Sequence, residues 1–261
     1  MPKDIPYASV EPDEYGYYPY SAEDDLVWRD LFDRQMRTLP GKVVPEYLDA
    51  IVALKLSRER TPQVVDIDRR LNDLSGAGVH GVPAIIPPTQ FFTLLSQRKF
   101  PVATFLRRRE DMDYIEEPDL FHEVFGHCPL LTNIDYADFI EGFGKLALSL
   151  GKGYSWHLFR LFWFTVEFGM IATKAGPRAY GAGIVSSPAE LAHATSPNAK
   201  IMPFNLPEVL RTPYRIDIVQ PVYFEIQSFT QLAALLERDL KAEIDAAKAA
   251  VDFEPLFTAS D

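Results

Sequence analysis

Two of the chain's five histidines, His122 and His127, lie five positions apart in the stretch EPDLFHEVFGHCP, residues 117–129. Zinc peptidases of the H-E-x-x-H type bind one metal with histidines four positions apart, which overlap on a helix. Residues five apart on an ideal helix point about 140° away from each other. For both imidazoles to reach one metal, the helix must end or loosen, which Gly126 and Pro129 favour. The alternative is two ordinary helix histidines, one buried and one exposed.

A carboxylate in a second apolar stretch, Glu167 in FRLFWFTVEFGMI at 159–171, is a candidate to join them. Arg160, Glu167 and Lys174 recur every seven positions, so one interpretation is a solvated helix face. The neighbours along that face are large and apolar, namely Trp163, Phe164, Met170 and Ile171. A carboxylate among them would be partly desolvated, which is costly unless it pairs with a cation such as Arg160 or binds a metal.

Two histidines and one carboxylate, without a thiolate, form the facial ligand set of non-haem Fe(II) sites. That set leaves open positions for O2 and substrate. Zinc also accepts two histidines and a glutamate, so the ligand types alone leave a hydrolase open. Aromatic residues around Glu167 favour an aromatic or apolar substrate over a peptide backbone. These wall residues are Phe162, Trp163, Phe164 and Phe168.

The elements that must position these residues are mostly helices. Ser21 followed by Asp24 marks a helix N-terminus, and Ser187 with Glu190 forms a second capping box. Apolar periodicity predicts helices at about 44–57, 62–75, 89–98, 118–127, 135–150, 155–175, 188–195 and 228–249. Short strands are expected within 76–88, 100–107, 184–185 and 214–226. We predict one mostly α-helical domain of packed helices over 1–261, with few short β-strands and an irregular segment at 1–20.

Composition restricts the functional class. A formal charge of −11 argues against a nucleic-acid partner, which needs clustered Lys and Arg. Cys128 is the only cysteine, which excludes an internal disulfide and a multi-cysteine zinc site. The N-terminus lacks the apolar stretch of a signal peptide, and the most apolar stretch, 158–172, is too short to span a bilayer. We expect a cytoplasmic protein with small-molecule partners and neither a membrane nor a nucleic-acid partner.

Three longer motifs occur in order along the chain. They are E-P-D-x-x-H-E-x-x-G-H-x-P at 117–129, W-F-T-V-E-F-G at 163–169 and A-Y-G-A-G-x-x-S-S at 179–187, followed by Gln220-Pro221, Tyr223 and Ser228-Phe229. In this combination the chain resembles the tetrahydropterin-dependent aromatic amino acid hydroxylases, most of all their bacterial phenylalanine-hydroxylating members. The resemblance covers about residues 80–230, the motif-bearing core of a single catalytic domain, and is far more specific than the histidine pair.

The resemblance implies roles for individual residues. His122, His127 and Glu167 would ligate Fe(II) and carry the catalysis, with tetrahydropterin and O2 as cosubstrates. Arg107, the first of three consecutive arginines, would bind the substrate carboxylate bidentately, and Asp119 would steady this region. The other implied substrate-site residues are Pro118, Trp163 and Phe168, which shape the aromatic pocket, and Ser186, which orients a ligand histidine.

For the pterin, the resemblance implies a binding segment from Val82 to Phe91. Phe91 would stack on the ring, and Val82, Ala84 and Ile85 would offer backbone contacts. Glu123 would hydrogen-bond the pterin, through water, and would not act as a peptidase base.

The implied reaction is hydroxylation of L-phenylalanine to L-tyrosine with O2, as in phenylalanine catabolism. Ile216 stands where the tyrosine-using relative carries an acid, which favours phenylalanine. Tryptophan as substrate, or the meta position of phenylalanine, stays open. More remote alternatives are a non-catalytic iron- or pterin-binding protein and a zinc hydrolase. No separate regulatory or tetramerisation domain is expected, which suggests a monomer or small homo-oligomer.

Overall fold

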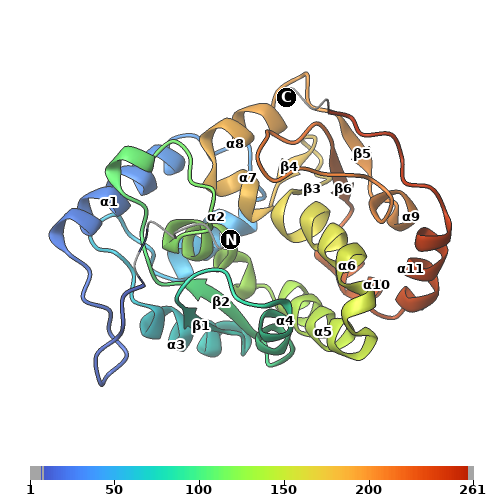
Figure 1. Ribbon diagram of the computed structural model, residues 1–261. Coiled ribbons are helices and arrows are strands. Elements are labelled where there is room, and N and C mark those ends of the chain that lie inside the picture. Colours follow the sequence, from blue (N-terminus) through green and yellow to red (C-terminus); the bar gives the residue numbers. More distant parts are fainter. Residues whose placement is uncertain (1–6, 8, 258–261) are drawn as a thin grey trace.

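The computed structural model describes residue 7 and residues 9–257 and confirms a mostly helical chain with a few short strands. Residues 9–20 are irregular, as expected, while residues 1–6 and 8 of that segment lie outside the described part. The α-helices, shown in Figure 1, are α1 (Ala22–Met36), α2 (Pro45–Ala53), α3 (Val64–Ser75), α4 (Pro88–Ser96), α5 (Ile134–Leu150), α6 (Ser155–Phe162), α7 (Ala182–Ser186), α8 (Pro188–Ala194), α9 (Leu206–Val209), α10 (Phe229–Leu235) and α11 (Leu240–Ala249). Short 3-10 turns lie at Arg109–Asp111, Pro129–Thr132 and Lys152–Tyr154.

The strands within the described residues form two small sheets. β1 (Gly78–Val82) and β2 (Lys99–Ala103) pair in parallel, and α4 forms the crossover that parallel strands require. The other sheet has the order β4-β3-β6-β5, with β3 (Gly169–Ile171), β4 (Arg178–Ala179), β5 (Ile201–Pro203) and β6 (Tyr223–Ile226). β6 is parallel to both neighbours, and β4 is antiparallel to β3. In Figure 1 the first sheet lies below the centre and the second at the upper right.

Local signals in the sequence define several helix ends. Ser21 and Asp24 form the predicted capping box at the start of α1, each bonding the other's backbone N–H. Gly76 ends α3 in the left-handed conformation, at φ 71°, which glycine adopts without steric cost. Trp28, Phe32 and Met36 recur every four positions and form an apolar stripe on α1: Trp28 and Phe32 are buried, and Met36 packs against the same core.

Four predicted elements differ from the structure. The helix expected over 155–175 is α-helical only to Phe162, continues as a π-helix and gives way to β3. The helix expected over 228–249 is divided into α10 and α11, and most of the strand expected over 214–226 is irregular before β6. Residues 184–185 lie in α7 and not in a strand. Short apolar segments of buried helices and buried strands look alike, so their neighbours in the fold decide between them.

The second predicted capping box is only half formed. Ser187 accepts a hydrogen bond from the backbone of Glu190, as expected at the start of α8. The Glu190 carboxylate does not return to Ser187, whose N–H already bonds Ile184. It accepts instead from the Gln220 backbone at 3.1 Å and from the Tyr223 hydroxyl at 2.5 Å. Long-range hydrogen bonds from Gln220 and Tyr223 therefore replace the expected local bond between the Glu190 carboxylate and the Ser187 N–H.

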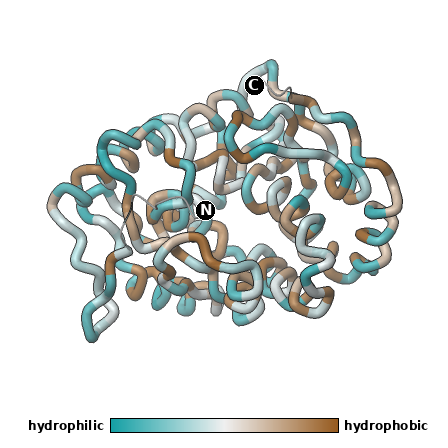
Figure 2. Tube along the Cα trace, viewed as in Figure 1, coloured by the Kyte–Doolittle hydropathy of each residue, from teal (hydrophilic) through white to brown (hydrophobic). Residues whose placement is uncertain are grey.

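Apolar side chains from both sheets and most helices form one contiguous core. Figure 2 shows hydrophobic and hydrophilic residues alternating along the helices, as expected where one face of each helix is buried. Within the described residues, no helix combines the length and apolar character needed to cross a bilayer. The fold also places two short helical segments, Phe121–His127 before α5 and Trp163–Glu167 after α6, beside each other.

Candidate metal centre and active site

The two histidines lie on a π-helix, Phe121–His127. The wider turn is visible in the bond from the Cys128 N–H to the Glu123 carbonyl, five residues back. The predicted loosening of the helix is therefore confirmed, and it brings residues five apart onto one side. The prediction that Pro129 disfavours a helical conformation at Cys128 is wrong, because Cys128 keeps helical dihedral angles. Pro129 itself begins a 3-10 turn.

Glu167 ends a second π-helix, Trp163–Glu167, which continues directly from α6. Here the Phe168 N–H bonds the Trp163 carbonyl, again five residues back. The alternative of a solvated stripe is wrong, since the helix ends before Lys174. Arg160 is not the partner of Glu167 either. It is buried and donates to Asp252 and to the Leu210 carbonyl.

The three candidate ligands converge. The Nε2 atoms of His122 and His127 are 3.1 Å apart. Glu167 approaches His127 Nε2 at 3.2 Å and His122 Nε2 at 3.5 Å. Ligand atoms about 2.1 Å from one ion and at right angles to each other would be separated by about 3.0 Å. The spacing therefore fits a single metal ion bound by all three side chains.

Glu123 is the other carboxylate near the histidines. Its Oε2 lies 3.9 Å from His127 Nε2, and it forms a possible three-residue metal group with His122 and His127. Glu167 is the better candidate ligand, because it lies close to both histidines. Burial, with the nearby Glu167 charge, raises the pKa of Glu123 well above its usual value. A carboxyl shifted in this direction keeps its proton to a higher pH than a free glutamate does.

The tautomer of His122 follows from its neighbour Ser186. The Ser186 hydroxyl donates to the Ala182 carbonyl at 2.7 Å, which uses its one proton. It must therefore accept the hydrogen bond that joins it to His122 Nδ1 at 3.0 Å. Nδ1 of His122 carries the proton, and Nε2 presents a lone pair to the centre of the three ligands. This donor set is suited to a divalent cation.

Electrostatics keep the side chains in the forms that bind metal. Burial lowers the pKa of His122 to about 4, although Glu167 opposes this, so its imidazole is neutral at pH 7. Burial alone would raise the pKa of Glu167, but His127 and His122 outweigh it and lower that pKa. A neutral imidazole and an ionised carboxylate are both ready to act as ligands.

Arg107 and Asp119 form a buried ion pair beside the histidines. The carboxylate of Asp119 accepts from Nε and Nη2 of Arg107, both at 2.8 Å, and from the His122 backbone N–H at 3.0 Å. Burial would raise the pKa of Asp119, but the Arg107 guanidinium lowers it. Within the described residues, Nη1 of Arg107 makes no hydrogen bond. Asp119 thus connects the segment after β2 to the histidine helix and binds one edge of the Arg107 guanidinium.

Aromatic rings line the approach to Glu167. Trp163 contacts Phe168 with ring centroids 4.5 Å apart and stacks on Tyr214 at 4.6 Å. Its indole N–H donates to the side chain of Gln220 at 2.9 Å. Pro118 is half-buried immediately before Asp119. Trp163 and Phe168 therefore lie together beside Glu167, while Pro118 adjoins Asp119 in the chain.

The expected pterin segment lies beside the second histidine. Phe91 meets Phe162 edge-on at 5.4 Å and contacts Phe100 at 6.3 Å, and Phe100 stacks on His127 at 4.4 Å. Val82 is buried at the end of β1, Ala84 is half-buried and Ile85 is 71% exposed. The segment from 83 to 90 thus leaves an accessible surface next to the ligands.

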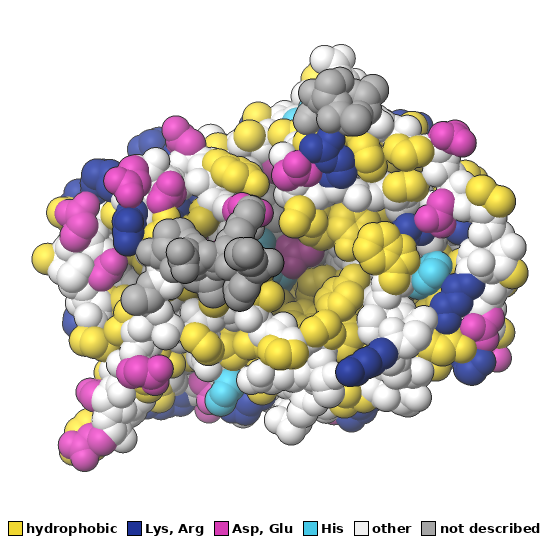
Figure 3. All heavy atoms as spheres, viewed as in Figure 1, with side chains coloured by type: hydrophobic (Ala, Val, Ile, Leu, Met, Phe, Trp, Pro, Cys, Tyr) yellow, Lys and Arg dark blue, Asp and Glu magenta, His cyan; other side chains and the backbone are white. Residues whose placement is uncertain are grey.

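Figure 3 shows a hollow near the middle of one face, with acidic and histidine side chains at its floor and hydrophobic side chains around it. The partial exposure of His122 and Glu167, at 18% and 16% of their side chains, agrees with access from solvent. Three residues of this region were not singled out from the sequence for a role. Tyr214 and Phe100 carried no local signal, and Gln220 was noted only as part of a motif.

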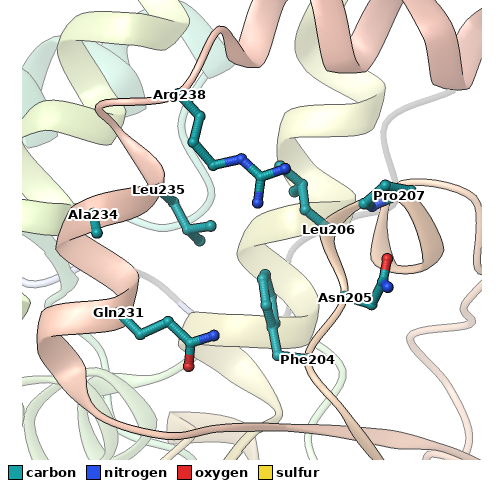
Figure 4. Close-up of a pocket in the computed structure, with 8 residues that line it drawn as sticks. All are labelled: Phe204, Asn205, Leu206, Pro207, Gln231, Ala234, Leu235 and Arg238. Atoms are coloured by element: carbon teal, nitrogen blue, oxygen red, sulfur yellow. The ribbon is translucent and has the colours of Figure 1, made fainter.

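Another hollow, of about 410 Å³, lies between α10 and the segment leading into α9 (Figure 4). It is lined by Phe204, Asn205, Leu206, Pro207, Gln231, Ala234, Leu235 and Arg238. Arg238 is the charged residue of this lining, and it pairs with Glu243 at 2.6 Å. The lining contains no histidine, cysteine or carboxylate, so it offers no metal ligands.

Comparisons with known proteins agree with this geometry. Residues 6–259 match the family described as biopterin-dependent aromatic amino acid hydroxylase. Phenylalanine-4-hydroxylase of Pseudomonas aeruginosa is 44% identical, covering 98% of this chain and 97% of that protein.

Solved structures are similar as well. Phenylalanine hydroxylase from Legionella pneumophila has a TM-score of 0.93 at 40% identity, covering 96% of this chain and all of that one. The Chromobacterium violaceum enzyme with bound oxidised Fe(III) has a TM-score of 0.89 at 37% identity, covering 97% of this chain and 92% of that one.

Proposed function

The chain belongs to the biopterin-dependent aromatic amino acid hydroxylase family, and on this basis we propose that it is a phenylalanine 4-monooxygenase. It hydroxylates L-phenylalanine to L-tyrosine, with tetrahydropterin and O2 as cosubstrates and Fe(II) as the metal. The observation that carries the proposal is the convergence of His122, His127 and Glu167 within 3.5 Å in a site walled by aromatic rings.

His122, His127 and Glu167 would hold Fe(II), which together with a tetrahydropterin would supply the chemistry that activates O2. The protein provides the ligands in their binding forms. Ser186 keeps the Nδ1 proton of His122 away from the metal. Asp119 accepts from the backbone N–H of His122 and so fixes the start of the histidine helix.

The amino-acid substrate binds through both of its ends. Arg107 takes the carboxylate through its Nη1 edge, while Asp119 holds the opposite edge in place. Pro118, Trp163 and Phe168 surround the aromatic ring. These contacts orient the ring toward the metal and exclude water, which is how positioning lowers a barrier.

The pterin binds along the segment after β1. Phe91 would stack on its ring, and Val82, Ala84 and Ile85 would offer backbone contacts. Glu123, whose pKa is raised by burial, would hydrogen-bond the pterin through water. The link from Phe91 through Phe100 to His127 supports this placement, because it keeps the pterin beside the metal.

We further propose that this is one catalytic domain acting in the cytoplasm as a monomer or small homo-oligomer, without a nucleic-acid or membrane partner. The contiguous core supports the first point, and the buried free thiol of Cys128 is compatible with a reducing compartment.

The test is anaerobic reconstitution with Fe(II), followed by tetrahydropterin, phenylalanine and air, with the product resolved by chromatography. Para-tyrosine is expected from the wild type and from Glu237→Ala, an exposed control carboxylate. Glu167→Ala should lose product and bound iron together.

Other outcomes would replace the proposal. Meta-tyrosine or hydroxytryptophan would keep the chemistry and change the substrate or position. Pterin-independent hydrolysis with Zn²⁺ would identify a hydrolase. Iron bound without any hydroxylated product would leave a binding protein.

A further inference from the structure

A buried glutamine closes the loop that precedes β6. Gln220 is 1% exposed, and its Nε2 donates to the carbonyls of Arg215 and Ile218, both at 2.9 Å. Its backbone N–H donates to the carboxylate of Glu190 at 3.1 Å. The side chain of Gln220 therefore closes the turn at 215–220, and its backbone N–H connects this turn to Glu190 in α8.

The same side chain reaches the aromatic wall. Gln220 Oε1 accepts the indole N–H of Trp163 at 2.9 Å. Tyr214, directly before the turn, stacks on the same indole at 4.6 Å with an interplanar angle of 22°. Phe168 contacts Trp163 at 4.5 Å. The indole is thus held by a hydrogen bond to its N–H, by the stacked ring of Tyr214 and by the tilted ring of Phe168.

This arrangement uses both donors and the acceptor of the amide side chain. Its two N–H groups donate to loop carbonyls, which points the amide oxygen away from the loop. That oxygen accepts the indole N–H of Trp163. Glu190 holds the backbone at this point and is itself fixed by the Tyr223 hydroxyl at 2.5 Å. The rigidity of the turn is therefore transmitted to a single rotamer of Trp163.

We propose that Gln220 is a positioning residue, which sets the affinity for the aromatic substrate by locking the Trp163 indole against the pocket. The inference rests on the proposed function, because Trp163 borders the substrate in that proposal. A merely structural glutamine would affect stability but not substrate binding through Trp163. The difference between these two roles can be measured as coupling between Gln220 and Trp163.

The experiment compares Gln220→Leu, Trp163→Phe, the double variant and the control Gln231→Leu, whose side chain bonds the Gln227 backbone away from the wall. Phenylalanine binding is titrated by calorimetry on the anaerobic Fe(II) protein, alongside KM, kcat and Tm. Gln220→Leu should raise Kd and KM about five- to tenfold, as expected for one lost hydrogen bond that positions a ring, and change kcat less than about threefold. In the Trp163→Phe background, the same change should raise Kd less than about twofold, because the indole N–H is already absent.

Additive effects on Kd, or an unchanged Kd in a folded Gln220→Leu protein, would overturn the inference. If Gln220→Leu does not fold, Trp163→Phe by itself tests the inference. In that variant Gln220 keeps its hydrogen bonds to the carbonyls of Arg215 and Ile218. An unchanged Kd there would show that the indole does not set affinity. A wild type that makes no hydroxylated amino acid would refute the proposed function instead, whereas an active wild type with uncoupled variants refutes only this inference.

Discussion

At the scale of single residues, the site depends on which atom of each side chain carries a proton. Ser186 is the sharpest case, since its own proton is committed to Ala182 and it must accept from His122. Hydrogen-bond partners of this kind orient ligand histidines and raise their affinity for metal.

We therefore expect Ser186→Ala to bind Fe(II) about 10- to 100-fold more weakly, because His122 loses the acceptor that fixes its tautomer. The measurement is Fe(II) titration under anaerobic conditions. Ser149→Ala is the matched control, since its hydroxyl bonds the Leu146 carbonyl on an exposed helix surface. Equal affinity of the Ser186 variant and the wild type would contradict the tautomer assignment.

Glu190 makes stability depend on pH. Burial raises its pKa from the ordinary 4.5 to about 7, although the Tyr223 and Gln220 bonds oppose this. The folded state therefore holds this proton more tightly than the unfolded state. Its contribution to stability is complete below pH 4.5 and is lost as pH rises through about 7.

Glu190→Gln removes that titration. Its Tm relative to wild type should therefore increase between pH 5 and pH 8, by an amount equivalent to at most about 3 kcal/mol. Thermal unfolding of the metal-free proteins at each pH measures it, with the exposed Glu237→Gln as control. A Tm difference that stays flat across this range would rule out a raised pKa at Glu190.

At the scale of elements, both segments that carry ligands end in π-helical turns. The i to i+5 bonds at Cys128 and at Phe168 widen each turn. A regular α-helix would separate His122 from His127 by about 140° around its axis. The second π turn is also supported from outside, since a Cβ at Gly181 would overlap the Glu167 carbonyl oxygen and the Gly169 nitrogen.

Gly181→Ala should therefore displace the end of the Glu167 helix. We expect a loss of about 1–3 kcal/mol in the free energy of unfolding, as for overpacked sites, together with weaker Fe(II) binding. Urea unfolding and iron titration measure the two effects. Gly153→Ala is the control, because nothing lies within 4 Å of its added Cβ. Wild-type iron affinity in the Gly181 variant would show that this contact does not position Glu167.

At the scale of the whole molecule, the ligands come from segments 40 residues apart that only the folded chain brings together. Iron should therefore bind the folded state and stabilise it. At free Fe(II) 100 times its Kd, the gain is about 2.7 kcal/mol, or about 5–10 °C in Tm for a chain of this size.

Anaerobic thermal unfolding with and without Fe(II) measures this shift. Glu167→Ala should lose most of it, while Glu237→Ala should keep it. A full shift in Glu167→Ala would mean that iron stabilises the protein at some other place.

The sequence by itself determined the ligand types, the family motifs and several helix ends. The capping box of Ser21, the stop at Gly76 and the need for a loosened helix between His122 and His127 are all local effects, involving residues at most five apart. Such signals can be read along the chain because backbone geometry relates near neighbours in a fixed way.

Only the tertiary structure decided which distant side chains meet. Arg160 pairs with Asp252, not with Glu167, and the Glu190 carboxylate bonds Gln220 and Tyr223 in preference to its own helix. Trp163 finds its acceptor in Gln220, 57 residues away. Each of these polar groups is buried and must be satisfied by whatever partner the packed core places within reach, and that choice is made when the elements assemble.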